Sequence, residues 1–260
     1  MKRILILVFV IVLFVHIVNF MQILFSPVSF YSVPPLKLNE KKIIIIDASK
    51  GGSEIGADSP NQILEKDVNL KVAQAIAAKL AANPNFSVFL TRNSDRTVSL
   101  DERLKIVTYK KAHTLITITS SEGNEWQKGY RVEFSGNNAV VEQSKKLAEN
   151  IGYSLRNNGF KPDAFSLISS LIPLYNMTFS FLDMTGIYNP DILTISTNNS
   201  VFQLTSGLDP IIQNSPSPAV LIACGYITSI SDLPNFYSDE NRTKLAIAVE
   251  EGLIRYFSEK

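Results

Sequence analysis

The sequence predicts an α/β domain in which a mostly parallel, twisted sheet is flanked by helices on both faces. First, apolar β-branched runs such as "KIIIIDA" are typical of strands covered on both sides. Second, segments with helical periodicity separate these runs, and such alternation favours an α/β sheet. Third, a length of 260 residues accommodates one domain of roughly 220 residues with a short additional segment.

Five short segments are expected to form the strands. They combine β-branched, aromatic and other apolar residues with few interruptions, which is the composition of buried strands. They are residues 42–48, 86–92, 114–120, 130–136 and 218–226.

Four longer segments have the periodicity of helices. In the first, Val68 and Val72 begin a series of apolar side chains at spacing four. In the second, Ser99 and Glu102 have the spacing of a capping box, which predicts a helix start at Ser99. The four segments are residues 64–83, 99–112, 139–157 and 240–257.

The N-terminus predicts a membrane anchor. No Asp, Glu, Lys or Arg occurs from Ile4 to Phe25, and a helix of that length spans a hydrocarbon core of about 30 Å. Lys2 and Arg3 favour a cytoplasmic N-terminus, which places the following domain outside the cytoplasm. A cleaved signal peptide is the competing interpretation, although the apolar run is long and no small-x-small site follows it. The expected organisation is a cytoplasmic tip (1–3), an anchor (4–25), a linker (26–40) and one domain (41–260).

Charge and cysteine content exclude several classes of protein. The chain has 25 Lys and Arg against 24 Asp and Glu, so nothing indicates a nucleic-acid partner. Cys224 is the single cysteine, which excludes an internal disulfide framework and a multi-cysteine zinc cluster. Its apolar neighbours predict a buried thiol.

Seven motifs occur in order between Lys42 and Phe257: "IIIIDASKGGSEIGA", "LEKDVNL", "FLTRNSDRTVSLDER", "AHTLITITSSEG", "GYRVEFSG", "SPAVLIACGYIT" and "RTKLAIAVEEGLIRYF". Together they resemble the zinc-dependent N-acetylmuramoyl-L-alanine amidases of bacterial cell-wall remodelling. The resemblance implies a metal at the carboxyl ends of the strands and peptidoglycan as substrate. It is interrupted by an atypical insert at about 160–200, where some members of the family have a regulatory helix that covers the active site.

The resemblance also shows which family residues have been replaced. The first zinc-binding histidine of the family matches Lys50, and the second matches Thr119. The glutamate ligand is retained as Glu65, whereas the glutamate that acts as general base matches Ala223. A catalytic zinc site needs about three protein ligands and an open position for water. We therefore expect no zinc and no catalytic residue at these positions.

Two other features of the sequence bear on this expectation. His113 lies six residues before Thr119 on the same predicted strand, about 20 Å away at 3.3 Å per residue, and cannot replace a ligand. A lysine ammonium only donates hydrogen bonds. Lys50 is accordingly expected to form an ion pair with Glu65 in place of the metal, or, alternatively, both are ordinary surface charges.

Other residues of interest fall into two groups. Arg92, Asp95 and Arg103 match family positions and are expected to tie a strand end to the following helix, rather than to contact substrate. Trp126, in the loop 120–129, is the only tryptophan and is a candidate for stacking on a sugar or anchoring a partner, together with Lys50. Packing against the domain is the alternative for Trp126.

Two functions remain open from the sequence, beside the plainer possibility of a structural domain with neither ligand nor partner at this site. The first is a membrane-anchored pseudoenzyme that binds peptidoglycan or envelope and division proteins as a scaffold or regulator in the bacterial cytoplasmic membrane. The second is an active amidase, which cleaves the amide between N-acetylmuramic acid and L-alanine, with ligands at positions that the motifs do not reveal. The missing histidines favour the first.

Overall fold

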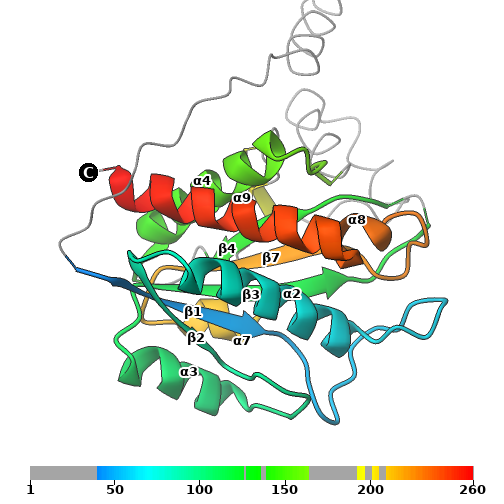
Figure 1. The fold of residues 1–260 in the computed structure, drawn as a ribbon, viewed down its shortest axis with the longest axis horizontal. Coiled ribbons are helices and arrows are strands. Elements are labelled where there is room, and N and C mark those ends of the chain that lie inside the picture. Colours follow the sequence, from blue (N-terminus) through cyan, green and yellow to red (C-terminus); the bar gives the residue numbers. More distant parts are fainter. Residues whose placement is uncertain are drawn as a thin grey trace, which may run out of the picture. The chain divides into compact units, whose positions relative to one another are not determined.

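The computed structural model describes residues 40–125, 127–135, 139–163, 192–196, 201–204 and 209–259, all within one compact unit, Val33–Lys260. Within these ranges, seven strands form one sheet in the order β2-β1-β3-β7-β4-β6-β5 (Figure 1). Their bounds are β1 (Lys42–Ala48), β2 (Phe86–Leu90), β3 (Thr114–Ser121), β4 (Arg131–Ser135), β5 (Ile192–Ser196), β6 (Val201–Leu204) and β7 (Ala219–Tyr226).

The sheet is mixed, with a parallel half and an edge that contains antiparallel pairs. Strands β1 and β2, β1 and β3, β3 and β7, and β4 and β6 are parallel. Strands β4 and β7, and β5 and β6, are antiparallel. The predicted α/β domain is confirmed. The carboxyl ends of the neighbouring parallel strands β1, β3 and β7 lie side by side.

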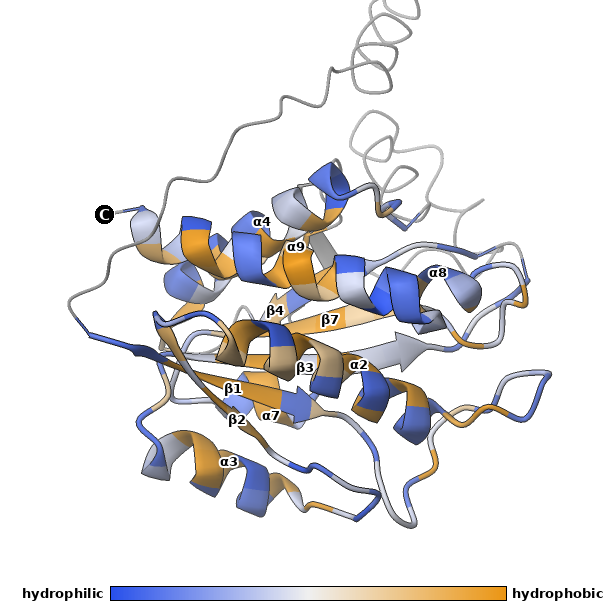
Figure 2. Cartoon of the chain, viewed as in Figure 1, coloured by the Kyte–Doolittle hydropathy of each residue, from blue (hydrophilic) through white to orange (hydrophobic). Residues whose placement is uncertain are grey.

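Helices cover both faces of the sheet (Figure 1). One face carries α2 (Glu65–Ala81), α4 (Val141–Asn157), the short α8 (Pro234–Tyr237) and α9 (Asp239–Ser258). The other carries α3 (Leu100–Tyr109) and α7 (Pro210–Asn214). Within β1, Ile44 and Ile46 join the apolar core under the first set, and Ile45 joins the core under the second. A strand covered on both faces needs this continuous apolar run. Figure 2 shows the corresponding hydrophobic colouring of β1 and β7.

The helix ends follow from local chemistry. The side chain of Ser99 accepts a hydrogen bond from the backbone N–H of Glu102 at 3.2 Å, which confirms the predicted cap of α3. Asp209 caps α7 in the same way, and its oxygen accepts from Ile211 N. Because α7, α8, β5 and β6 have only four or five residues each, they carry little periodicity, and the sequence did not predict them.

The predicted anchor, residues 4–25, and linker up to residue 39 lie outside the described residues. Over the part of the chain that the structure does describe, none of the helices is long and apolar enough to cross a membrane. Trp126 and most of the 160–200 insert, apart from 160–163 and the strand β5, also lie outside the described residues.

Candidate functional site

The positions that match the family's reaction centre lie together in the structure, at the carboxyl ends of the central strands. Lys50 follows β1, Glu65 is the first residue of α2, and Thr119 lies near the end of β3. Thr119 is the register partner of Ala223 in the parallel pair of β3 and β7. The sequence motifs, separated by more than a hundred residues, therefore converge on one place.

The Glu65 carboxylate is buried, with 5% of the residue exposed. Both of its oxygens accept hydrogen bonds from the protein. Its Oε1 accepts from the Thr119 hydroxyl at 2.8 Å and from Asn69 Nδ2 at 3.1 Å. Its Oε2 accepts from the backbone N–H of Ala57 at 3.1 Å. A buried carboxylate needs such donors or a cation, since an unpaired one is costly. Here the protein's own neutral donors meet that need.

Gly56 allows this close packing around the carboxylate. Its φ is +69°, a left-handed conformation that glycine adopts readily. A Cβ at this position would lie 2.3 Å from Glu65 Oε2, so any side chain would displace the carboxylate. The glycine-rich turn after β1 therefore serves to fold the chain over Glu65.

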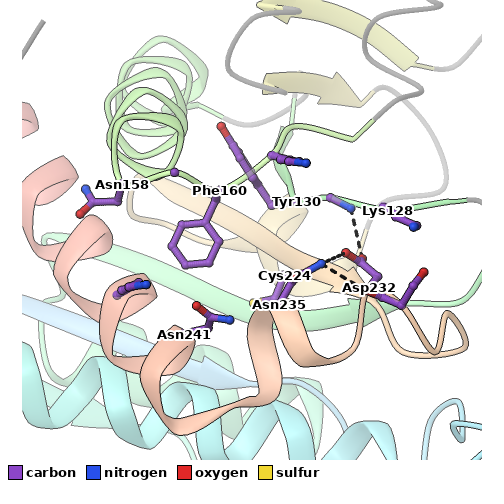
Figure 3. Close-up of a pocket in the computed structure, with 13 residues that line it drawn as sticks. Lys128, Tyr130, Asn158, Phe160, Cys224, Asp232, Asn235 and Asn241 are labelled. Carbon is purple, nitrogen blue, oxygen red and sulfur yellow. Dashed lines mark hydrogen bonds between the residues drawn. The ribbon is translucent and has the colours of Figure 1, made fainter. Parts of the chain in front are cut away.

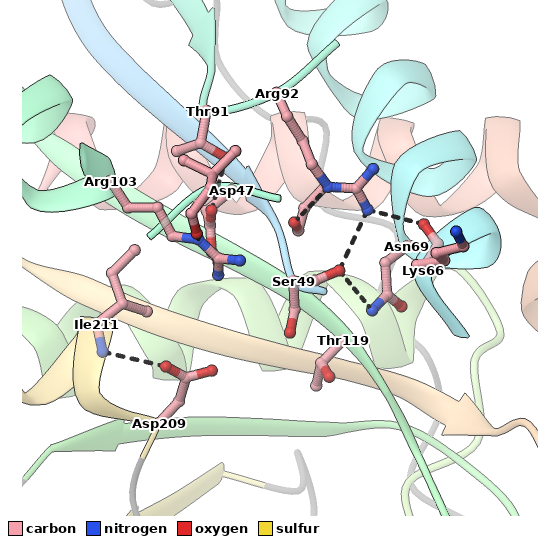
Figure 4. A network of polar contacts seen from close by, with 12 residues as sticks. Asp47, Ser49, Lys66, Asn69, Thr91, Arg92, Arg103, Thr119, Asp209 and Ile211 are labelled. Carbon is pink, nitrogen blue, oxygen red and sulfur yellow. Dashed lines mark hydrogen bonds and ion pairs between the residues drawn. The ribbon is translucent and has the colours of Figure 1, made fainter. Parts of the chain in front are cut away.

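Asn69 extends the contacts of Glu65 into the surrounding backbone. Its Nδ2 also donates to the carbonyl of Ser49 at 3.2 Å, and its Oδ1 accepts from the Ser120 hydroxyl at 3.0 Å. The same Ser49 carbonyl accepts from Arg92 Nη2 at 3.2 Å (Figure 4). Because each group has a defined partner, the Glu65 side chain is held in one orientation.

The expected ion pair between Lys50 and Glu65 is not found among the described residues. Lys50 is half-buried and adopts a left-handed backbone conformation with φ of 65°. The salt bridges of the described chain do not include it. The physical reason lies in Glu65, whose oxygens are already bonded to Thr119, Asn69 and Ala57. The side chains that contact the carboxylate are those of Thr119 and Asn69 rather than that of Lys50.

Ala223, at the position of the family's general base, is buried with 2% exposure and belongs to the core beneath α3 and α7. Its methyl group cannot accept a proton. Its partner in the antiparallel pair with β4 is Arg131, so the two lie opposite each other on adjacent strands.

Arg131 is the centre of a buried polar network that the sequence did not predict. Its guanidinium contacts Asp163 Oδ2 at 2.8 Å, the Tyr226 hydroxyl at 2.6 Å and Glu133 Oε1 at 3.0 Å. The Tyr226 hydroxyl donates to Asp163 at 2.6 Å. Burial raises the pKa of the Tyr226 phenol well above its usual range, so this group stays neutral. Asp163 lies at the start of the atypical region, and no motif indicated that it would pair with Arg131.

Arg92 ties β1 to α2, the two elements that carry the site. It is 2% exposed, and its Nε and Nη2 donate to the carbonyl oxygens of Ala48 at 3.0 Å and Lys66 at 2.8 Å (Figure 4). Asp95 accepts from the backbone N–H of Gly52 and from Lys66 Nζ, both at 2.7 Å. Both residues make structural contacts between the loop after β2, the glycine turn and α2. The sequence predicted a tie to the helix that follows β2, which is α3, whereas these contacts reach the turn after β1 and the preceding helix.

Arg103 makes a third tie, from α3 to the sheet. Its Nη1 lies 3.3 Å from Asp47 Oδ2, and the residue Asp47 is fully buried. The Thr91 hydroxyl donates to the other oxygen of Asp47 at 2.6 Å (Figure 4). Burial raises the pKa of Asp47, and the neighbouring Arg103 opposes this shift.

His113 lies at the other end of the strands and takes no part in the site. It precedes β3, and its Nδ1 accepts a hydrogen bond from the backbone N–H of Ile43, near the start of β1, at 3.0 Å. Burial, and then the nearby Lys42, lower its pKa. Its position agrees with the separation from Thr119 that strand geometry predicts.

The donor set does not fit a catalytic zinc ion. Thr119 donates its hydroxyl proton to Glu65, Lys50 has no lone pair at neutral pH, and Ala223 has no ligand atom. Across the described ranges, no three His, Cys, Asp or Glu side chains are grouped so that they could hold a metal. Of the residues that the resemblance matches to zinc ligands, only Glu65 has a side chain able to bind the ion.

The fold and this site define the class of protein, an α/β domain with a buried polar centre at the carboxyl ends of its parallel strands. Comparison with known proteins identifies the family within this class. The sequence pattern of the N-acetylmuramoyl-L-alanine amidases matches residues 44–255, and the chain belongs to this family of cell-wall amidases.

Curated relatives include a probable N-acetylmuramoyl-L-alanine amidase of Haemophilus influenzae, 27% identical over 84% of this chain. The chain spans 52% of that protein. A putative amidase of Buchnera aphidicola is 23% identical over 85% of this chain, and 97% of its length is covered.

Solved structures of amidases share the fold. An N-acetylmuramoyl-L-alanine amidase from Clostridium difficile 630 superposes with a TM-score of 0.66 at 19% identity, over 85% of this chain and 99% of its own. The CwlD amidase from Clostridioides difficile, solved in complex with the GerS lipoprotein, gives a TM-score of 0.63 at 18% identity, over 85% and 100% of the two chains.

Proposed function

We propose that this chain is a non-hydrolytic member of the cell-wall amidase family, anchored in the bacterial cytoplasmic membrane by residues 4–25. Its domain would act on the extracytoplasmic side as a binding or regulatory protein for peptidoglycan or for envelope and division proteins. The observation that carries the proposal is the closure of Glu65 by Thr119, Asn69 and Ala57. A carboxylate bonded in this way is a structural group rather than an available metal ligand.

Two further observations support the proposal. Ala223 supplies no acceptor for the proton of an attacking water, which zinc hydrolases require. The structural ties made by Arg92, Asp95 and Arg103 preserve the loops around the former site. A scaffold that is intact while the reaction centre is absent suits a binding role. One structural neighbour is a complex of an amidase with a lipoprotein, which supports a protein partner as one mode of action.

The second candidate is an active N-acetylmuramoyl-L-alanine amidase. The names of the relatives favour it, because proteins that match over most of this chain are described as amidases. It requires ligands other than Lys50 and Thr119, and these would have to come from outside the described residues.

Sedimentation with purified peptidoglycan separates the two candidates. The full-length chain, in detergent, is mixed with cell-wall sacculi, and both the bound protein and the soluble peptides released are measured. The proposal predicts saturable binding with no release of peptide from glycan over hours, with or without added zinc. Release of free stem peptides that rises with zinc concentration would instead establish the active amidase.

A further inference from the structure

A second polar centre lies on the other side of β7 from Ala223. It is a cavity of about 360 Å³, which is within the range of small-ligand pockets. Cys224 forms part of its lining and belongs to the core under α2, α4 and α9, whereas Ala223 belongs to the opposite core. None of the residues that contact Glu65 lines it. We call it the α4–α9 pocket, lined by Lys128, Gly129, Tyr130, Asn158, Gly159, Phe160, Lys161, Cys224, Ser231, Asp232, Asn235, Asn241 and Lys244.

The charge of the pocket is positive. Lys128 comes from the connection between β3 and β4, Lys161 follows α4, and Lys244 lies on α9. Lys244 pairs with Glu240 at 2.6 Å, while the ion pairs among described residues include neither Lys128 nor Lys161. Three segments far apart in the sequence thus contribute lysines to the lining of one cavity.

The single carboxylate in the lining does not neutralise these lysines. Asp232 is 2% exposed. Its Oδ2 accepts from the backbone N–H of Tyr226 at 2.8 Å. The same oxygen accepts from the backbone N–H of Gly129 at 3.1 Å, and Oδ1 accepts from Asn235 at 3.1 Å (Figure 3). The carboxylate is therefore turned into the wall, where it fixes the loop that follows β7.

Two side-chain amides of the lining, Asn158 and Asn235, use their N–H groups within the protein and keep their oxygens as hydrogen-bond acceptors. Nδ2 of Asn158 donates to the Ser154 carbonyl at 2.9 Å and to Glu251 at 2.7 Å, which uses both of its hydrogens. Nδ2 of Asn235 donates in the same way to Ser231 and Asp232. The carbonyl oxygens of Asn158 and Asn235 remain as hydrogen-bond acceptors. Phe160, Tyr130 and Cys224 add apolar surface to the lining (Figure 3).

From these groups we propose that the α4–α9 pocket binds a small organic carboxylate that carries N–H or O–H donors beside the carboxylate. Lys128 and Lys161 bind the carboxylate, the amide oxygens of Asn158 and Asn235 accept from the neighbouring donors, and Phe160 packs against the apolar part of the ligand. Short peptides with a free C-terminus and sugar acids both have this chemistry. The proposal does not depend on whether the chain hydrolyses peptidoglycan, because the pocket shares no residue with the Glu65 site.

Titration calorimetry of the full-length chain tests this inference. The probes are N-acetyl-alanyl-alanine, its C-terminal amide and glucuronic acid. We expect saturable binding of at least one carboxylate, and no binding of the peptide amide at tenfold higher concentration. Comparison of the peptide with the sugar acid identifies which source of carboxylate is preferred.

Variants locate the binding in the pocket. Lys128→Ala/Lys161→Ala, which changes two exposed side chains, should weaken binding at least tenfold. Lys41→Ala/Lys105→Ala removes the same net charge elsewhere and should leave the affinity within twofold. Absence of binding by both carboxylates, equal binding of the peptide and its amide, or equal losses in the two double variants would each overturn the proposal.

Discussion

The hydrogen bond from the Thr119 hydroxyl to the Glu65 carboxylate makes a contribution to stability that can be measured. Thr119→Val replaces the hydroxyl by a methyl group of similar size. It removes the donor that lies 2.8 Å from Glu65 Oε1, and only 5% of Glu65 is exposed. Hydrogen bonds to charged groups contribute about 1.5–3 kcal/mol, and a buried acceptor that loses its donor is destabilised by a similar amount. We therefore expect the free energy of unfolding to fall by about 2 kcal/mol.

Urea unfolding of a fragment that contains residues 30–260, followed by circular dichroism, gives this difference directly. With a slope near 2 kcal/mol/M, the midpoint should decrease by about 1 M. Thr108→Val is the matched control, because Thr108 is exposed on α3 and its hydroxyl only contacts a carbonyl of its own helix. The control should change stability by less than about 0.5 kcal/mol. Equal losses for the two variants would refute the idea that Thr119 stabilises a buried carboxylate.

A double-mutant cycle with Glu65→Gln assigns the loss to the pair. The amide keeps a carbonyl oxygen but no charge, so the Thr119 hydroxyl contributes less to its stabilisation. Thr119→Val should then cost at least about 1 kcal/mol less in the Glu65→Gln background than in the wild type. Strict additivity would show that the two side chains do not interact.

Three further predictions concern other parts of the domain. Arg103→Met leaves the buried Asp47 without its ion pair and should lower the free energy of unfolding by about 3 kcal/mol in urea titrations; a loss below 1 kcal/mol contradicts the pairing. Burial lowers the pKa of His113, so stability should fall as pH decreases below about 6.5 and level off below the folded-state pKa. His113→Gln should remove this pH dependence, and an unchanged slope would contradict it. Trp126→Ala should weaken sedimentation with sacculi about tenfold if the sole tryptophan stacks on a sugar ring; unchanged binding would favour packing in the domain.

The sequence predicted the architecture well where the physics is local. Continuous apolar runs at residues 42–48 and 218–226 identified central strands because strands covered on both faces need them. Ser99 and Glu102 identified the start of α3, since capping depends on neighbouring residues. The short strands β5 and β6 were missed because four or five residues do not establish a period.

The site could be predicted only in part, because its contacts are long-range. Family motifs indicated that Glu65, Thr119 and Ala223 would meet, and they lie at one edge of the sheet. They did not indicate which donor would satisfy the carboxylate, and the structure places the Thr119 hydroxyl there rather than the Lys50 ammonium. The Arg131 and Asp163 pair joins two segments that no motif connects. Such choices depend on the orientation of side chains in the folded protein.

Restoring the family's residues provides the positive control for the central claim. Lys50→His/Thr119→His/Ala223→Glu introduces two imidazoles beside Glu65 and a carboxylate at the position of the base. A histidine suits the left-handed position of Lys50 better than most residues do. The triple variant should bind zinc and cleave muropeptides.

The most direct measurement is the zinc content of the purified wild-type chain after incubation with zinc and removal of excess metal, made alongside muropeptide cleavage. We expect less than 0.1 zinc per chain and no cleavage for the wild type, with stoichiometric zinc in the triple variant, which supplies two of about three ligands. Stoichiometric zinc in the wild type, with release of peptide from glycan, would contradict the account and establish an amidase with ligands outside the described residues.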